Sequence, residues 1–93
     1  MDVREITRAL EALLDSLSGR VDAAEIDMSR DDLDAGEWRL AFEALLAALA
    51  AERVAVTEAE RADLLRLAAD LDIDPAPVGE LPERPAAQED PAL

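Results

Sequence analysis

Leucine and alanine recur at helical spacing through the first 71 residues, and this pattern constrains the fold more than any other feature. Between residues 3 and 17 the apolar positions stand three or four apart, which places them on one side of an α-helix. Valine and isoleucine are few and never alternate with polar residues over four or more positions, as a half-buried strand requires. The sequence therefore predicts an all-α fold.

Start and stop signals divide the pattern into four helices. We expect these helices at about residues 2–18, 23–35, 37–52 and 58–71. Gly19 and Gly36 follow the first and second helices, where a left-handed residue commonly ends a helix. Thr57 and Glu60 form the T-x-x-E pattern of a capping box before the fourth. Short connections predict antiparallel neighbours, and hence a compact four-helix bundle over residues 1–74.

The third predicted helix is apolar on two sides. Trp38, Phe42 and Leu45 belong to one stripe, which we expect in the core. A second stripe on the opposite side consists of Leu40, Ala44, Ala47 and Ala51. Such a helix is either the central helix of the bundle or carries an interface on its alanine side.

The leucine pattern ends at Pro75. All five prolines of the chain lie from there onward, among alanines and scattered acidic residues. Two leucines and one valine cannot bury enough surface to offset the entropy of ordering this segment. We therefore expect residues 75–93 to be a disordered, Pro/Ala-rich acidic tail.

The charge of the chain is strongly unbalanced. Twenty-three Asp and Glu residues face nine Arg, and the formal net charge is -14. Negative charge at this density attracts basic partners and repels phosphate backbones and anionic lipid. The longest apolar run, residues 44–51, is far shorter than the roughly 18 to 20 residues of a membrane span. We predict a basic protein as the partner, with neither nucleic acid nor membrane binding.

The chain contains no histidine, lysine or cysteine. It therefore lacks the usual general base near neutral pH, the thiol nucleophile and the soft metal ligands. No base is available in the sequence to activate Ser16, Ser18 or Ser29. We expect no enzymatic activity and no cofactor. The absence of cysteine agrees with a cytoplasmic, reducing location.

Acidic residues cluster on the second predicted helix. Asp27, Asp31 and Asp34 share one side of it, with Glu37 close beyond Gly36. Arg30 is their only local counter-charge. The cluster is either a solvated surface or the docking surface of a basic partner, and like charges four residues apart are mildly destabilising until something binds them. A divalent metal would normally need loop oxygens as well, so we predict no metal.

The segment from Leu33 to Leu45, together with the earlier Gly19-Arg20, resembles the MafI family of bacterial immunity proteins. That family has a Gly-Arg turn after its first helix and a Gly-Glu-aromatic step into a helix reading x-Leu-Ala-x-Glu-x-Leu. Gly19-Arg20 and Gly36-Glu37-Trp38 match this pattern, and the resemblance covers residues 3–74. It implies a small helical antidote that neutralises a secreted toxin domain, often a nuclease, by stoichiometric binding.

Together these features predict a cytoplasmic helical domain that binds and neutralises a cognate basic toxin domain. The expected contact residues are Asp27, Asp31, Asp34 and Glu37, and the free protein is expected to be a monomer. The alternative is a small self-associating scaffold or adaptor. In that case the second stripe of the third helix would pair with the same stripe of another copy.

Overall fold

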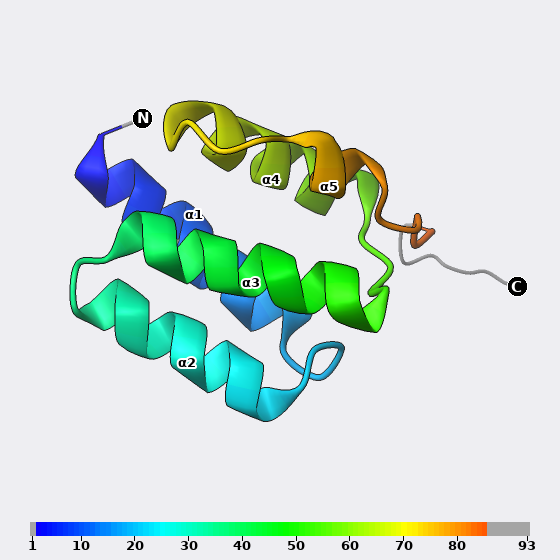
Figure 1. The fold of residues 1–93 in the computed structure, drawn as a ribbon, viewed down its shortest axis with the longest axis horizontal. Coiled ribbons are helices and arrows are strands. Elements are labelled where there is room, and N and C mark those ends of the chain that lie inside the picture. Colours follow the sequence, from blue (N-terminus) through cyan, green and yellow to red (C-terminus); the bar gives the residue numbers. More distant parts are fainter. Residues whose placement is uncertain (1, 86–93) are drawn as a thin grey trace, which may run out of the picture.

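The computed structural model describes residues 2–85, which form five helices. They are α1 (Val3–Leu17), α2 (Ala23–Asp34), α3 (Trp38–Glu52), α4 (Glu58–Asp70) and α5 (Ala76–Gly79). Between the helices, this part of the chain has two isolated β-bridges and no strand. Figure 1 shows α3 crossing the front of the molecule, with α1 behind it, α2 on one side and α4 and α5 on the other. The predicted all-α class is confirmed.

The four long helices agree with their predicted ranges to within one residue at each end. The capping box of α4 is confirmed, since Thr57 Oγ1 accepts from the Glu60 N–H at 3.1 Å and Glu60 Oε1 accepts from the Thr57 N–H at 2.8 Å. A second box, which the sequence analysis missed, starts α1. There Asp2 and Glu5 exchange two such bonds of 2.9 Å. Reciprocal caps of this kind satisfy backbone donors that a helix start leaves free.

Gly19 and Gly36 adopt left-handed backbone conformations, with φ values of 93° and 79°. Gly36 follows α2, and its N–H donates to the carbonyl of Leu33 at 3.0 Å. Conformations with positive φ cost glycine little because it has no Cβ. The two predicted glycine stops are confirmed.

The core is almost entirely aliphatic and is built by all five helices. Phe42 and Leu45 are buried, as predicted, among leucines of α1 and α4. Trp38 is only half-buried and packs against the edge of the core. It is the first residue of α3. The prediction that Trp38 is a core residue is therefore correct only in part.

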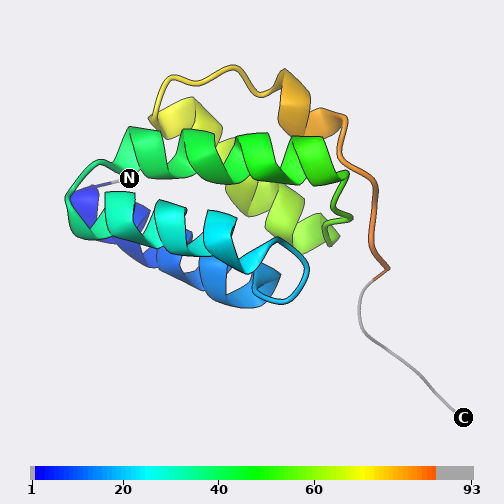
Figure 2. The same ribbon diagram turned by 60° about the horizontal axis from the view of Figure 1, so that its bottom comes forward.

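Helices α2 and α3 are antiparallel and lie side by side, as both views show (Figures 1 and 2). Ser29 is fully buried between them, and its Oγ donates to the carbonyl of Ala41 at 2.8 Å. The small side chains at these two positions allow the helices to approach closely. The second stripe of α3 is mostly exposed: Leu40 is 50% exposed, Ala47 and Ala51 are exposed, and Ala44 is half-buried.

The prediction of a disordered tail is wrong for residues 75–85, which we call the C-terminal strap. Its side chains Val78 and Leu81 are buried in the core. The guanidinium of Arg61 donates to the carbonyls of both residues, at 2.6 Å and 2.8 Å. Further along, the Val56 N–H donates to Pro82, and the Arg84 N–H donates to Val56. Two buried side chains and four hydrogen bonds offset the entropy of ordering this segment. Residues 86–93 of the predicted tail lie outside the described residues.

The strap adds a fifth helix to the four that the sequence predicts. Helix α5 contacts both α3 and α4, and those two helices are not a closely packed pair. Figure 2 shows α5 above the end of α3, on the side where α4 lies. The fold is thus a compact all-helical domain of five helices, in which α5 contacts both α3 and α4.

Candidate functional site

The predicted acidic residues are all exposed. Ile26, Ser29 and Leu33 turn one side of α2 toward the core, and helical periodicity therefore places Asp27, Asp31 and Asp34 on the other side. Glu37 follows at the start of α3, also exposed, and its side chain makes no capping hydrogen bond. We call Asp27, Asp31, Asp34 and Glu37 the acidic face.

The acidic face has no internal counter-charge. Arg30, which the sequence placed among these carboxylates, instead donates to Asp15 of α1 at 2.7 Å. Within residues 2–85, none of the four side chains of the acidic face makes an ion pair. Their mutual repulsion is therefore uncompensated in the free protein.

An apolar side chain stands beside these carboxylates. Met28 is 52% exposed and lies on the outer side of α2, one position after Asp27 and three before Asp31. Methionine is flexible and polarizable, and it adapts to the shape of a binding partner. Exposed methionine next to unpaired carboxylates is a combination suited to a protein partner with basic and apolar side chains.

The most strongly perturbed titratable group lies elsewhere, between α1 and α4. Glu60 is 8% exposed and accepts hydrogen bonds from the guanidinium of Arg20 and, at 2.8 Å, from the hydroxyl of Ser16. Arg20 also donates to the carbonyls of Ala55 and Ser16. Burial by itself would raise the pKa of Glu60. The hydrogen bonds from Arg20, Thr57 and Ser16, with the charge of Arg20, outweigh burial and lower this pKa from 4.5 to about 2.

The pairing of Ser16 with Glu60 superficially resembles a nucleophile beside a base. A carboxylate with a pKa of about 2 is a poor proton acceptor near neutral pH, and both of its oxygens already accept hydrogen bonds. The cluster therefore serves to join the α1–α2 turn to the start of α4. Thr57 and Glu60, which we predicted as structural residues, have that role.

Across residues 2–85, no three acidic side chains converge closely enough to hold a metal ion. None of the five helices is both long and apolar enough to cross a bilayer.

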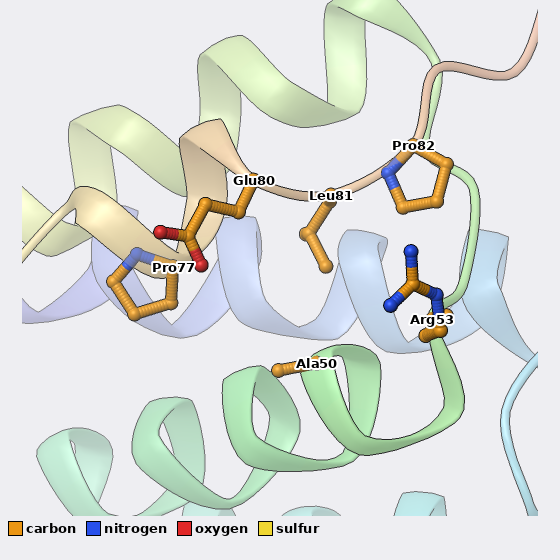
Figure 3. Close-up of a pocket in the computed structure, with 6 residues that line it drawn as sticks. All are labelled: Ala50, Arg53, Pro77, Glu80, Leu81 and Pro82. Carbon is orange, nitrogen blue, oxygen red and sulfur yellow. The ribbon is translucent and has the colours of Figure 1, made fainter.

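Three surface cavities follow one another, from the side of α3 that faces the strap to the connection between α3 and α4. The first is lined by Glu43, Leu46, Ala47, Ala50 and Pro77. The second shares Ala50 and Pro77 with it and adds Arg53, Glu80, Leu81 and Pro82 (Figure 3). The third shares Arg53 with the second and adds Arg20, Glu52, Val54, Ala55 and Arg84. Their volumes are about 240, 250 and 500 Å³. We call this series the strap groove.

The sequence pattern does not predict the strap groove, because one wall of the groove falls in the expected tail. One wall comes from α3 and the other from residues at least 24 positions later in the chain, from Arg53 to Pro77. The only signal in the sequence was the pair Val78 and Leu81 at helical spacing after Pro75.

Comparison of the chain with protein-family models, with curated proteins and with solved structures found no significant match.

Proposed function

We propose that this protein binds a basic protein stoichiometrically through the acidic face and neutralises it. The observation that supports this most directly is the exposed, unpaired state of Asp27, Asp31, Asp34 and Glu37. Arg30 binds Asp15 and therefore does not neutralise the acidic face. A basic partner would supply that counter-charge. It would also remove the repulsion along α2.

The net charge of -14 supports the same proposal at longer range. Opposite charges on two proteins accelerate their encounter, by factors of about 10 to 1,000 in steered associations. Domains that bind or cleave nucleic acid are commonly basic, because they contact phosphate. The resemblance of residues 3–74 to MafI immunity proteins suggests that the partner is a cognate toxin domain of this kind. In this proposal the protein acts in the cytoplasm as a binding module and catalyses no reaction.

The first experiment replaces Asp27, Asp31 and Asp34 with Asn and measures association with a basic toxin domain. We expect a folded protein whose on-rate at low salt falls by about tenfold, with the difference shrinking at high salt. Protection of cells that co-express the toxin domain should weaken in parallel.

A matched control changes the net charge equally at exposed positions outside the acidic face. Replacing Glu11, Glu58 and Glu83 with Gln removes three charges from α1, α4 and the strap. This variant should keep most of the on-rate. If both triple variants associate equally fast, the acidic face is not the contact, and only the overall charge matters.

A second candidate function is self-association through the outer stripe of α3, as in a small scaffold or adaptor. It is favoured by the 50% exposure of Leu40 and by the exposed Ala47 and Ala51. Small residues on a helix allow close approach of a second copy. Sedimentation should then show a dimer that Leu40→Asp dissociates, whereas Leu65→Asp, at an exposed leucine of α4, does not.

A further inference from the structure

The strap groove changes in character along its length. Its first cavity is lined by Leu46, Ala47, Ala50 and Pro77 with a single charged residue, Glu43, whose carboxylate lies 3.6 Å from Arg39. Its last cavity has three arginines on its wall, of which Arg20 is occupied by Glu60. The groove therefore runs from an apolar end to a basic end.

Two guanidinium groups at the basic end have no bonding partner within the described residues. Within residues 2–85, the side chains of Arg53 and Arg84 make no ion pair or hydrogen bond. The other arginines from Arg20 onward bind carboxylates or backbone carbonyls. Within the same residues, Arg4 and Arg8 on α1 also make no ion pair, so what distinguishes Arg53 and Arg84 is that both line one cavity. Glu52 also lines this cavity, but its carboxylate accepts the N–H of Asp22 at 3.1 Å and forms no ion pair with either arginine.

Arg53 also occupies a backbone position that suits glycine. Its φ is 52° and its ψ is 49°, in the left-handed region at the end of α3. A side chain there is strained by comparison with glycine, which is the usual residue where a helix ends in this conformation. Arg53 and Asp72 are the two non-glycine residues with positive φ in residues 2–85, and such conformations cluster at functional sites. Here the side chain lies under Pro82, on the wall of the groove (Figure 3).

We propose that the strap groove binds an extended, acidic segment of another protein. An apolar side chain of that segment occupies the cavity at Ala47 and Ala50, and a carboxylate further along pairs with Arg53 and Arg84. Guanidinium groups bind carboxylates through charge-assisted hydrogen bonds. Glu80 lies on the opposite wall with its carboxylate turned away from Arg53, and its charge directs an incoming carboxylate toward the arginine end (Figure 3).

The length of the groove sets the spacing within that segment. From Ala47 to Arg53, α3 rises about 9 Å, which equals about three residues of an extended chain. The apolar residue and the first carboxylate should therefore stand about three positions apart. This site is separate from the acidic face, so a negative result at one site leaves the proposal for the other site intact.

The experiment measures binding of a fluorescent, end-blocked peptide, Gly-Leu-Pro-Ala-Glu-Glu-Gly, to the full chain. We expect saturable binding that is lost when both Glu residues of the peptide become Gln, and also when its Leu becomes Ser. Arg53→Gly and Arg84→Ala should each weaken binding by about tenfold, the effect of losing one charge-assisted bond. Arg8→Ala, which removes the same charge from an exposed position on α1, should bind like the original protein.

Arg53→Gly has a second readout that separates binding from folding. Glycine relieves the left-handed strain, so this variant should melt at a temperature about 3 °C higher while binding the peptide less well. Arg53→Lys should recover part of the binding. The triple Asn variant of the acidic face should bind the peptide normally.

Three results would overturn the proposal. The first is that the original chain fails to bind the acidic peptide, or binds its Gln form equally well. The second is that Arg53→Gly and Arg84→Ala both bind unchanged. The third is a homodimer that Arg53→Gly dissociates, which would assign the groove to carboxylates of a second copy.

Discussion

Arg20 and Glu60 form an ion pair across 40 residues of sequence, with the guanidinium donating to both oxygens of the carboxylate. The pair connects the turn after α1 to the first turn of α4. Its side chains are 21% and 11% exposed, so solvent screens it only partly. Ser16 and the Thr57 N–H complete the hydrogen bonding of the carboxylate. Buried charges that are fully hydrogen-bonded in this way make stability depend on pH.

We predict that Glu60 stabilises the fold at neutral pH and that this contribution is lost in acid. The pKa of Glu60 is about 2 in the folded state, below its ordinary value of 4.5. A carboxyl group whose pKa is lower in the folded than in the unfolded state stabilises the fold at pH values above the unfolded pKa. This stabilisation disappears as pH falls from about 4.5 to about 2. The difference corresponds to about 3 kcal/mol.

The measurement is urea unfolding of the original protein and of Glu60→Gln at pH 7 and pH 2.5. Gln keeps the capping geometry but cannot titrate. The stability gap between the two proteins should be largest at pH 7 and shrink in acid. Other carboxylates titrate in both proteins, so their effects cancel in the gap. A gap that does not change with pH would show that the charge of Glu60 contributes nothing.

The stability cost of replacing Gly36 should depend only on how readily the new residue adopts a positive φ. A Cβ built at this position meets no atom within 4 Å, so only the φ of 79° opposes a side chain. Gly36→Val should cost about 1 kcal/mol or more, and Gly36→Asn less, because asparagine enters the left-handed region readily. Gly79 is a matched control, since it has equal space and no positive φ. Thermal melts in which Gly79→Ala costs as much as Gly36→Ala would contradict this explanation.

Removal of the strap should destabilise the domain. Ending the chain after Asp74 exposes the core that Val78 and Leu81 cover, and each buried aliphatic side chain contributes about 1.5 to 3 kcal/mol. We expect the free energy of unfolding to fall by about 3 kcal/mol or more. A chain ending at Pro85 separates the strap from the residues that follow it. Equal denaturation midpoints for the chains ending at 74 and 85 would show that the strap does not support the fold.

Substitution of Ser29 should destabilise the fold whether it removes the hydroxyl or adds bulk. Ser29→Ala removes the hydrogen bond to Ala41 and should cost about 1 kcal/mol. Ser29→Val adds bulk where α2 and α3 approach closely and should cost about 1 to 3 kcal/mol. Ser18→Ala, at an exposed position, serves as the control in the same denaturant titrations. A stable Ser29→Val variant would mean that the two helices can separate without cost.

Much of the local structure follows from the sequence alone. The ends of α2 and α4, the glycine stops and the Thr57–Glu60 capping box depend on residues within one helical turn, so their signals are continuous in sequence. Helical periodicity likewise predicts that Asp27, Asp31 and Asp34 face outward together. The exposure of the acidic face was therefore predictable without a structure.

Tertiary structure decided which distant groups meet. Arg30 had carboxylates within its own helix, yet it binds Asp15 because the packing of α2 on α1 brings that side chain nearer. Two apolar side chains are too few to order a segment by themselves. Val78 and Leu81 are nevertheless buried in the core, and Arg61 of α4 donates hydrogen bonds to both of their carbonyls. The strap groove exists only after that docking. Such contacts depend on the positions of several helices at once, and no short stretch of sequence encodes them.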